Sequence, residues 1–184
     1  MSVGIAFANM AMYHHTLLLT MLLSGRRQWR KEAIDKDDFM RVPHLIPETH
    51  LYLVQDRALL LMRRCNTGYQ DGRYGLVAGH VEPGEDFVDA MIRETREEVG
   101  LTLAPDALEI VHVMYRLKTG DERIAGFVRV RDWQGEPRIM EPDKCDDLQW
   151  FPLHALPENM IPYVRQCVTY IRQGIFYSQR YGDD

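Results

Sequence analysis

Between Gly79 and Leu101, four of the glutamates and one of the arginines form a pattern at fixed distances from the leading glycine. These residues are Glu85, Arg93, Glu94, Glu97 and Glu98. Carboxylates clustered in this way, with no Cys or His ligand among them, suit a hard cation such as Mg²⁺ or Mn²⁺ and do not suit zinc. The spacing therefore predicts a divalent-metal site built from oxygen ligands.

A helix is needed to position these acids. Pro83-Gly84 turns the chain, and the acidic residue Asp86 follows where a helix would start. Gly100 is a C-terminal stop, so we predict a helix from about Asp86 to Val99. Its apolar face has the period of a buried stripe. The members of that stripe are Val88, Ile92, Thr95 and Val99, widened by Phe87, Ala90 and Met91.

A Glu-rich helix end is most often a solvated surface, but the arrangement fits that interpretation poorly. Glu94 and Glu98 are an i, i+4 pair of like charges with Glu97 beside them, so they repel one another. They also stand in the C-terminal half of the helix, where its dipole disfavours anions. A cation should compensate, and Arg93 can pair with a neighbouring carboxylate and fix its orientation.

The whole run from Gly79 to Leu101 resembles the signature of the Nudix hydrolases, which cut nucleoside diphosphates linked to another group. Thr95 is the one departure, because it stands where the family has an aliphatic residue. The resemblance implies an α+β fold, an α/β/α sandwich with a mixed sheet. It also implies that Arg93 orients Glu94 and that Glu85 is structural. The implied metal ligands are Glu94, Glu97, Glu98 and the carbonyl of Gly79.

The implied reaction is the hydrolysis of a pyrophosphate linkage. Its negative charges repel an attacking water unless metal ions neutralise the phosphates and acidify the water. We hypothesise that Mg²⁺ (or Mn²⁺) bridges the glutamates to the substrate and that a carboxylate takes the proton. The catalytic candidates are Glu98, Glu94 and Arg93. The base stays open, with Glu141 behind Glu98 and Glu94.

Outside this run the substrate-binding candidates are Arg63, Arg64, Glu141 and Trp150. Arg63-Arg64 ends a predicted strand and can reach phosphates as bidentate donors, although a solvated pair is equally consistent with the pattern. Glu141 and Trp150 lie in a stretch that resembles the downstream part of family members acting on nucleoside triphosphates. Trp150 either stacks on a base or packs in the core.

The resemblance favours a nucleoside triphosphate pyrophosphohydrolase that releases a monophosphate and pyrophosphate, with oxidised or non-standard dNTPs among its substrates. The proline typical of ADP-ribose pyrophosphatases is absent, since Arg116 and Leu117 occupy that zone. The extended motifs of NADH and coenzyme A pyrophosphatases are absent too. Alternatives left open are an enzyme acting on ADP-ribose, a nucleotide sugar or a capped RNA end, and a non-catalytic nucleotide-binding regulator.

Composition is that of a soluble protein. The chain has 184 residues, a net charge of −5 and 46% hydrophobic residues, with no long basic stripe. We expect a small nucleotide as partner, no membrane and no long nucleic acid, and we leave a homodimer open. Three widely spaced cysteines without a CxxC pair predict reduced thiols in the cytoplasm. These are Cys65, Cys145 and Cys167.

The chain divides into an N-terminal extension of unknown role, residues 1–39, and a single domain, residues 40–184. The extension has an apolar stretch followed by basic and then acidic residues. A secretory signal has its basic residues first, so that reading is weak. An organelle presequence and a native start at Met40 are the other interpretations that stay open.

Alternating apolar runs and turn residues predict a strand-rich domain. Leu51–Val54 with Ala58–Met62, and Leu108–Leu117 with Ile124–Trp133, read as two hairpins. Further elements are predicted as a strand at Tyr74–Ala78 leading into Gly79, a strand at Leu148–Leu153, and a helix starting at Pro162 and ending at Gly174 with Val164, Val168 and Ile171 on one face.

Overall fold

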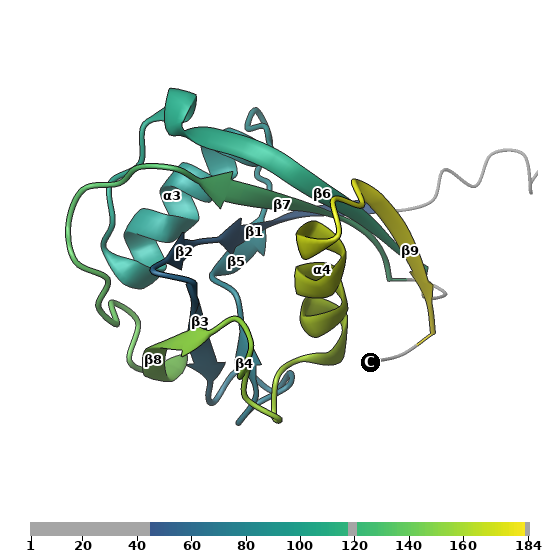
Figure 1. Ribbon diagram of the computed structural model, residues 1–184. Coiled ribbons are helices and arrows are strands. Elements are labelled where there is room, and N and C mark those ends of the chain that lie inside the picture. Colours follow the sequence, from purple (N-terminus) through teal and green to yellow (C-terminus); the bar gives the residue numbers. More distant parts are fainter. Residues whose placement is uncertain (1–44, 118–120, 183–184) are drawn as a thin grey trace, which may run out of the picture. The chain divides into compact units, whose positions relative to one another are not determined.

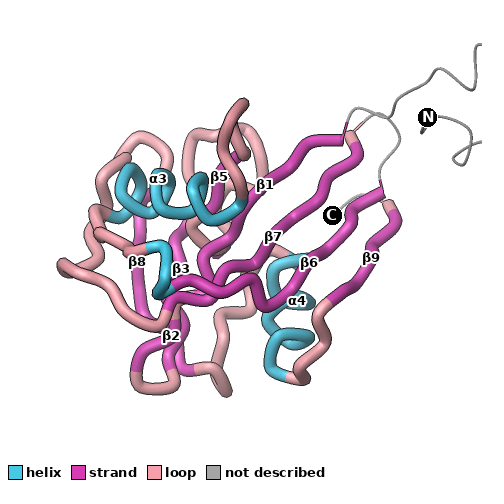
Figure 2. The backbone as a smooth tube through the Cα atoms, turned by 90° about the horizontal axis from the view of Figure 1, so that it is seen from above, coloured by secondary structure: helices cyan, strands magenta, loops and turns pink. Residues whose placement is uncertain are grey.

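The run from Gly79 to Leu101, called the acidic run below, begins in an edge strand of the larger of two sheets. The computed structural model describes residues 45–117 and 121–182. Five strands follow one another in the order β5 (Ala78–His80), β1 (Leu45–Tyr52), β7 (Glu122–Val130), β6 (Leu108–Leu117) and β9 (Tyr177–Tyr181); the same order can be followed in Figure 2. The pairs β1–β7 and β6–β9 are parallel, whereas β1–β5 and β6–β7 are antiparallel. The sheet is therefore mixed.

The smaller sheet is built around one strand. It contains β2 (Val54–Gln55), β3 (Ala58–Arg64), β4 (Tyr74–Gly75) and β8 (Cys145–Pro152). All three neighbours are antiparallel to β3. Strand β8 pairs with one edge of β3 along its whole length. Strands β2 and β4 therefore both pair with the other edge of β3. Arg63 and Arg64 end the central strand of this sheet.

Two helices cover opposite faces of the larger sheet. Along β7, Ala125 and Phe127 belong to the hydrophobic cluster that includes α4 (Pro162–Arg172). The alternate residues Val128 and Val130 belong to the cluster that includes α3 (Phe87–Val99). Side chains alternate between the faces of a strand, so the two helices lie on different faces. Figure 1 shows β1 and β5 between them. The expected α/β/α sandwich is confirmed.

Helix α3 has the ends that its sequence predicts. Asp86 is the N-cap and not the first helical residue: its side chain accepts from the N–H groups of Val88 and Asp89, in a capping box with Asp89. Gly100 caps the other end in the left-handed conformation, with φ of 71°. The buried residues are Ala90, Met91, Thr95 and Val99. Val88 and Ile92 of the predicted stripe are only half-buried.

Two predicted elements differ from the structure, and one strand of the structure was not predicted. The expected strand Tyr74–Ala78 is two strands, β4 and β5, because the chain crosses from one sheet to the other between them. The first predicted hairpin is only β2–β3, since Leu51 belongs to the larger sheet. The edge strand β9 was not predicted at all. The second hairpin is confirmed as β6–β7, and α4 begins at Pro162 as expected.

Further expectations concern membrane spans, the cysteines and the N-terminal extension. None of the helices in the described part of the chain is long and apolar enough to span a lipid bilayer. All three cysteines are free thiols, as expected. The predicted extension, residues 1–39, lies outside the described residues, as does the boundary at Met40.

Candidate functional site

Gly79 and Glu94 fit against each other at the edge of the larger sheet. Gly79 lies on β5, opposite Thr49 of β1. A Cβ atom added to Gly79 would stand 1.8 Å from Oε1 and 1.9 Å from Cδ of Glu94. The carboxylate therefore occupies the space that any side chain at position 79 would need. This contact explains why a glycine leads the acidic run.

Arg93 is the cationic centre of the run. Its Nε and Nη2 donate to Oε1 and Oε2 of Glu85 at 2.8 and 2.9 Å, a bidentate pair. Nη1 donates to Glu94 Oε1 at 2.6 Å and to Glu97 Oε2 at 3.3 Å, and Nη2 also reaches the His80 carbonyl at 3.0 Å. The hydrogen bonds from Arg93 lower the pKa of Glu85 to about 2. Arg93 is thus bonded to Glu94, and its role in orienting that carboxylate stays a prediction.

Glu98 is a half-buried carboxylate of the run. Its Oε2 accepts a hydrogen bond from the Ala78 backbone N–H at 3.1 Å. Burial is the main cause that raises the pKa of Glu98 to about 8; the charges of Glu94 and Glu141 act in the same direction, and the bond from Ala78 acts against them. Burial and the two acidic neighbours therefore disfavour the ionised form of Glu98.

The oxygen donors fit a hard divalent cation, although they are not arranged as a finished coordination shell. Glu97 is the most exposed of the three predicted carboxylate ligands, with 55% of its side chain accessible. Among residues 45–117 and 121–182, no three Asp, Glu, His or Cys side chains stand close enough to hold an ion as placed. Glu94 and Glu98 are both half-buried, and carboxylates are typical ligands of Mg²⁺ and Mn²⁺. Ligation by Glu97 and by the Gly79 carbonyl stays a prediction.

One cleft, with a cavity volume of about 750 Å³, is lined by Gly79, Arg93, Glu94, Glu97 and Glu98. Glu141 and Lys144 line it too, and Lys144 Nζ lies 2.8 Å from Glu141 Oε1. The segment that carries them is fastened at two places: Met140 N–H donates to the Glu98 carbonyl at 3.0 Å, and Cys65 N–H donates to the Lys144 carbonyl at 2.9 Å. The structure therefore brings Glu141 to the acidic run, 43 residues after Glu98 in the sequence. Lys144 was not predicted.

A buried carboxylate lies elsewhere in the same cleft. Glu48 is only 6% exposed and accepts hydrogen bonds from Arg116, from Arg123 Nη1 at 3.1 Å and from His50 Nε2 at 3.1 Å. Arg116 also stacks on the ring of Tyr163, with 4.1 Å between its guanidinium carbon and the ring centroid. Sequence reasoning missed this cluster. The available signal was a Glu and two Arg within apolar strands, but only the strand pairing brings them together.

We expect Glu48→Gln to lower stability most at neutral pH. Burial raises the pKa of Glu48, but the hydrogen bond from His50, the charge of Arg116 and the hydrogen bond from Arg123 lower it further, so the folded-state value is well below the ordinary 4.5. Stability from such a group is present above the unfolded-state pKa and is lost as the pH falls through the folded-state value. We expect a deficit of about 3 kcal/mol at neutral pH. Thermal unfolding of both proteins from neutral pH to about pH 3 should show the difference shrinking below about pH 4.5; a constant difference would contradict this.

The remaining predicted residues lie in different places. Arg64 lines the cleft, where its guanidinium lies 5.6 Å from the ring centroid of the cleft residue Tyr69. Arg63 instead pairs with Asp146 at 2.7 Å and is not among the lining residues. Trp150 is also outside the lining: it packs against the α3-side core, 6.4 Å from the ring of Trp133. Of the two interpretations of Trp150, this placement matches core packing.

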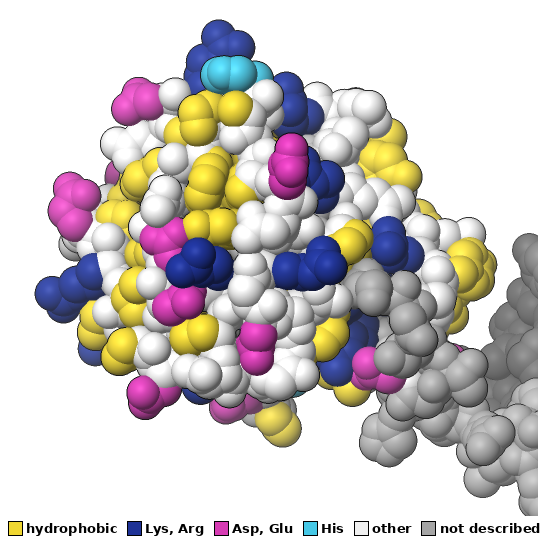
Figure 3. Space-filling model, turned by 90° about the horizontal axis from the view of Figure 1, so that it is seen from below, with side chains coloured by type: hydrophobic (Ala, Val, Ile, Leu, Met, Phe, Trp, Pro, Cys, Tyr) yellow, Lys and Arg dark blue, Asp and Glu magenta, His cyan; other side chains and the backbone are white. Residues whose placement is uncertain are grey.

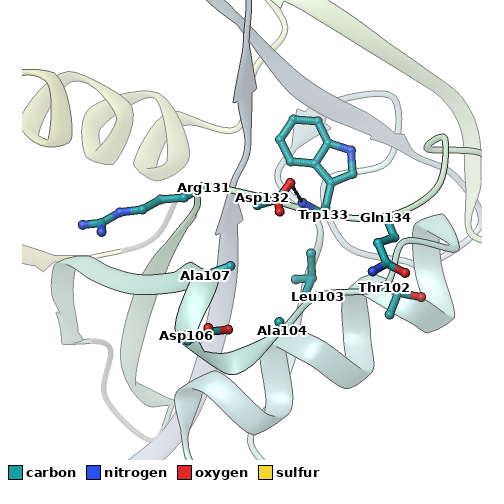
Figure 4. A pocket seen from close by; sticks show the side chains of 9 residues that line it. All are labelled: Thr102, Leu103, Ala104, Asp106, Ala107, Arg131, Asp132, Trp133 and Gln134. Atoms are coloured by element: carbon teal, nitrogen blue, oxygen red, sulfur yellow. Dashed lines mark hydrogen bonds between the residues drawn. The ribbon is translucent and has the colours of Figure 1, made fainter.

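A second hollow of about 380 Å³ lies away from the acids (Figure 4). It is bounded by residues 102–107 and 131–134, which the backbone pairing of Thr102 with Gln134 holds together. It shares no lining residue with the cleft of the acidic run. On the face of the molecule drawn in Figure 3, acidic and basic side chains are interspersed, without a broad patch of either sign.

Comparison with known proteins finds a matching family and several relatives. A family model described as NUDIX domain matches residues 47–170. A NAD-capped RNA hydrolase NudC of Pseudomonas putida (strain GB-1) is 29% identical over 141 residues, which are 73% of this chain and 45% of that protein. The chain spans about half the length of the curated relatives it matches.

Solved structures agree on the fold. A MutT NUDIX hydrolase from Burkholderia pseudomallei aligns with a TM-score of 0.63 and 28% identity, covering 68% of this chain and 96% of that one. A MutT protein from Methanosarcina mazei Go1 aligns with a TM-score of 0.61 and 20% identity, covering 70% and 94%. At that lower identity the likeness concerns the fold alone.

Proposed function

The chain belongs to the Nudix family, and from that premise we propose that it hydrolyses a pyrophosphate linkage in a nucleoside diphosphate bound to another group. One observation carries this proposal. Glu94 and Glu98 converge with Glu141 in a cleft of about 750 Å³, and Arg93 and Gly79 hold Glu94 in place. Oxygen donors of this kind suit the magnesium chemistry that a charged diphosphate needs.

The side chains divide the work by position. A bound Mg²⁺ or Mn²⁺ would be held by Glu94, Glu97 and Glu98, and it would neutralise the phosphates and acidify the attacking water. Arg93 orients Glu94 through their 2.6 Å contact. Glu98, Glu94 and Glu141 each line the cleft and are the candidates for taking the proton of the water. Arg64 and Lys144 supply positive charge to the same cleft, where phosphate oxygens would lie.

For the substrate we propose a nucleoside triphosphate, with oxidised or non-standard dNTPs included, cut to the monophosphate and pyrophosphate. Support comes from the likeness to the MutT hydrolase, which this chain covers almost completely. A dinucleotide of the NAD type is the second candidate. It is favoured by the name of the curated relatives, and by two Arg–Tyr contacts in the cleft that could each support a planar group, Arg64 with Tyr69 and Arg116 with Tyr163.

A substrate panel with Mg²⁺ tests the proposal. It should contain the four dNTPs, an oxidised dGTP, NAD, ADP-ribose and an RNA with a NAD cap, with products separated by chromatography and kcat/KM measured for each. We expect pyrophosphate and a monophosphate from triphosphates. Release of NMN and AMP from NAD alone would select the second candidate, and AMP from ADP-ribose alone would select a sugar-nucleotide enzyme.

Two further results would change the assignment. Cleavage of the capped RNA but not of free NAD would contradict the expectation that long nucleic acid is no partner. No cleavage of any phosphoanhydride, together with binding of a nucleotide, would refute the catalytic proposal and favour a nucleotide-binding regulator.

A further inference from the structure

Strand β9 is at one edge of the larger sheet as the described residues form it. Among the described strands it pairs only with β6, in parallel register from Val113–Tyr177 to Leu117–Tyr181. The opposite edge of the sheet is closed differently: Arg93 Nη2 donates to the backbone carbonyl of His80 on β5. An unpaired edge can accept a further strand, which proteins otherwise prevent with charges, prolines or bulges. Figure 1 shows β9 at one side of the sheet.

The backbone groups of β9 point alternately inward and outward. Val113 N–H donates to the Phe176 carbonyl at 2.7 Å, and Gly182 N–H donates to the Leu117 carbonyl at 3.2 Å. The even-numbered residues of β9 therefore direct their N–H and C=O groups at β6. Hydrogen-bonding direction alternates along a strand, so Tyr177, Gln179 and Tyr181 direct theirs away from the sheet.

The side chains of β9 also alternate between the two faces of the sheet, and those on one face bind the strand to its neighbours. On the α4 side, Ser178 Oγ lies 2.9 Å from His112 Nε2, and Arg180 Nη1 donates to Gln166 Oε1 at 2.8 Å. On the other side Tyr177 and Tyr181 are 54% and 69% exposed. Helix α3 packs on that side against β1, β5 and β7, and so leaves the tyrosines uncovered. The strand thus presents outward backbone groups and exposed aromatic rings together.

We propose that β9 pairs antiparallel with β9 of a second copy of this chain, around a twofold axis at Gln179. In this register Tyr177 lies opposite Tyr181 of the second copy, and Gln179 lies opposite its own counterpart. All three outward residues then form hydrogen-bonded pairs. Cross-strand aromatic pairs stabilise such a ladder, and the single cation, Arg180, lies opposite Ser178 and not opposite another charge. The strand sequence Tyr-Ser-Gln-Arg-Tyr can therefore pair with itself through aromatic pairs and without a like-charge clash, which favours a second copy as the occupant.

Sedimentation velocity of the full chain tests this dimer. We expect a mass of twice 21.5 kDa, with a dissociation constant raised about 100-fold by Gln179→Pro, which removes the central outward N–H without touching the bonds to β6. Gln179→Thr is the matched control, because it keeps the N–H and favours a strand. A wild-type monomer at every concentration, or a Gln179→Pro variant that dimerises like the wild type, would overturn the proposal.

A charge exchange separates lost pairing from lost folding. The variant Tyr177→Lys/Tyr181→Lys should be monomeric, and so should Tyr177→Glu/Tyr181→Glu, because each places like charges opposite one another. Mixing the two should restore a dimer. Failure of the mixture to associate, with both variants folded by circular dichroism, would refute this register. Amides of Tyr177 and Gln179 protected from hydrogen exchange in a monomer would show that the chain covers its own edge, which would also refute the second copy as occupant.

Discussion

Glu98→Gln is expected to lower kcat with Mg²⁺ by about 10³-fold while leaving the protein folded. The carboxylate lines the cleft together with Glu94 and Glu141, and it belongs to the proposed metal-binding set. The amide has the same shape and can still accept the bond from Ala78 N–H, but it carries no charge for a cation. Because burial raises the pKa of Glu98 to about 8, the wild-type carboxyl must bind a proton on folding at neutral pH, and the neutral amide removes that cost. We therefore expect the midpoint of thermal unfolding to stay unchanged or to rise.

Three measurements separate these effects. Stopped assays give kcat, Mn²⁺ titration followed by electron paramagnetic resonance gives the metal affinity, and thermal unfolding gives the stability. Glu158→Gln is the matched control, since it makes the same change at an exposed residue that does not line the cleft. It should retain wild-type kcat and Mn²⁺ affinity. If Glu98→Gln kept more than about a tenth of wild-type kcat, the central role proposed for Glu98 would be wrong.

Local pattern was sufficient to predict the parts of this site that one segment of chain contains. The Asp86 cap, the Gly100 stop and the apolar face of α3 are written in consecutive residues, because helix ends and helix faces depend on near neighbours. The like charges of Glu94 and Glu98 led to the prediction of a cation from their spacing alone, and metal binding there stays a prediction. Arg93 lies between Glu85 and Glu94 and hydrogen-bonds to both.

Contacts between distant segments could not be predicted in the same way. Glu48 meets Arg116 and Arg123 only because β1 pairs with β7 and β7 with β6, and no local pattern specifies that register. Lys144 reaches the cleft through a turn that is bonded both to the end of α3 and to the residue after β3. Trp150 shows the converse case. Its proximity in sequence to Glu141 suggested a base platform, but the alternation of β8 directs it into the core.

Gly79→Ala is the second change with a large expected effect. It removes no charge and no hydrogen-bonding group, so the effect comes only from the added methyl group. The new Cβ would meet the carboxylate of Glu94 at 1.8 Å, far inside contact distance. Glu94 cannot yield without giving up its 2.6 Å bond to Arg93. We expect the carboxylate to be displaced, with kcat reduced about 100-fold and the free energy of unfolding lowered by about 1–3 kcal/mol.

A control and a second substitution distinguish this clash from a general effect of losing a glycine. Gly68→Ala introduces strain at a φ of 76° but meets no atom within 4 Å, so it should lose some stability and keep its kcat. In the double variant Gly79→Ala/Glu94→Ala the clashing carboxylate is gone, so stability should recover toward that of Glu94→Ala although activity stays low. Chemical denaturation of the four proteins in this cycle gives the coupling energy between positions 79 and 94. Additive losses would mean that Gly79 is needed for its backbone and not for the space it leaves to Glu94, and the contact between them would then not be what holds the carboxylate in the cleft.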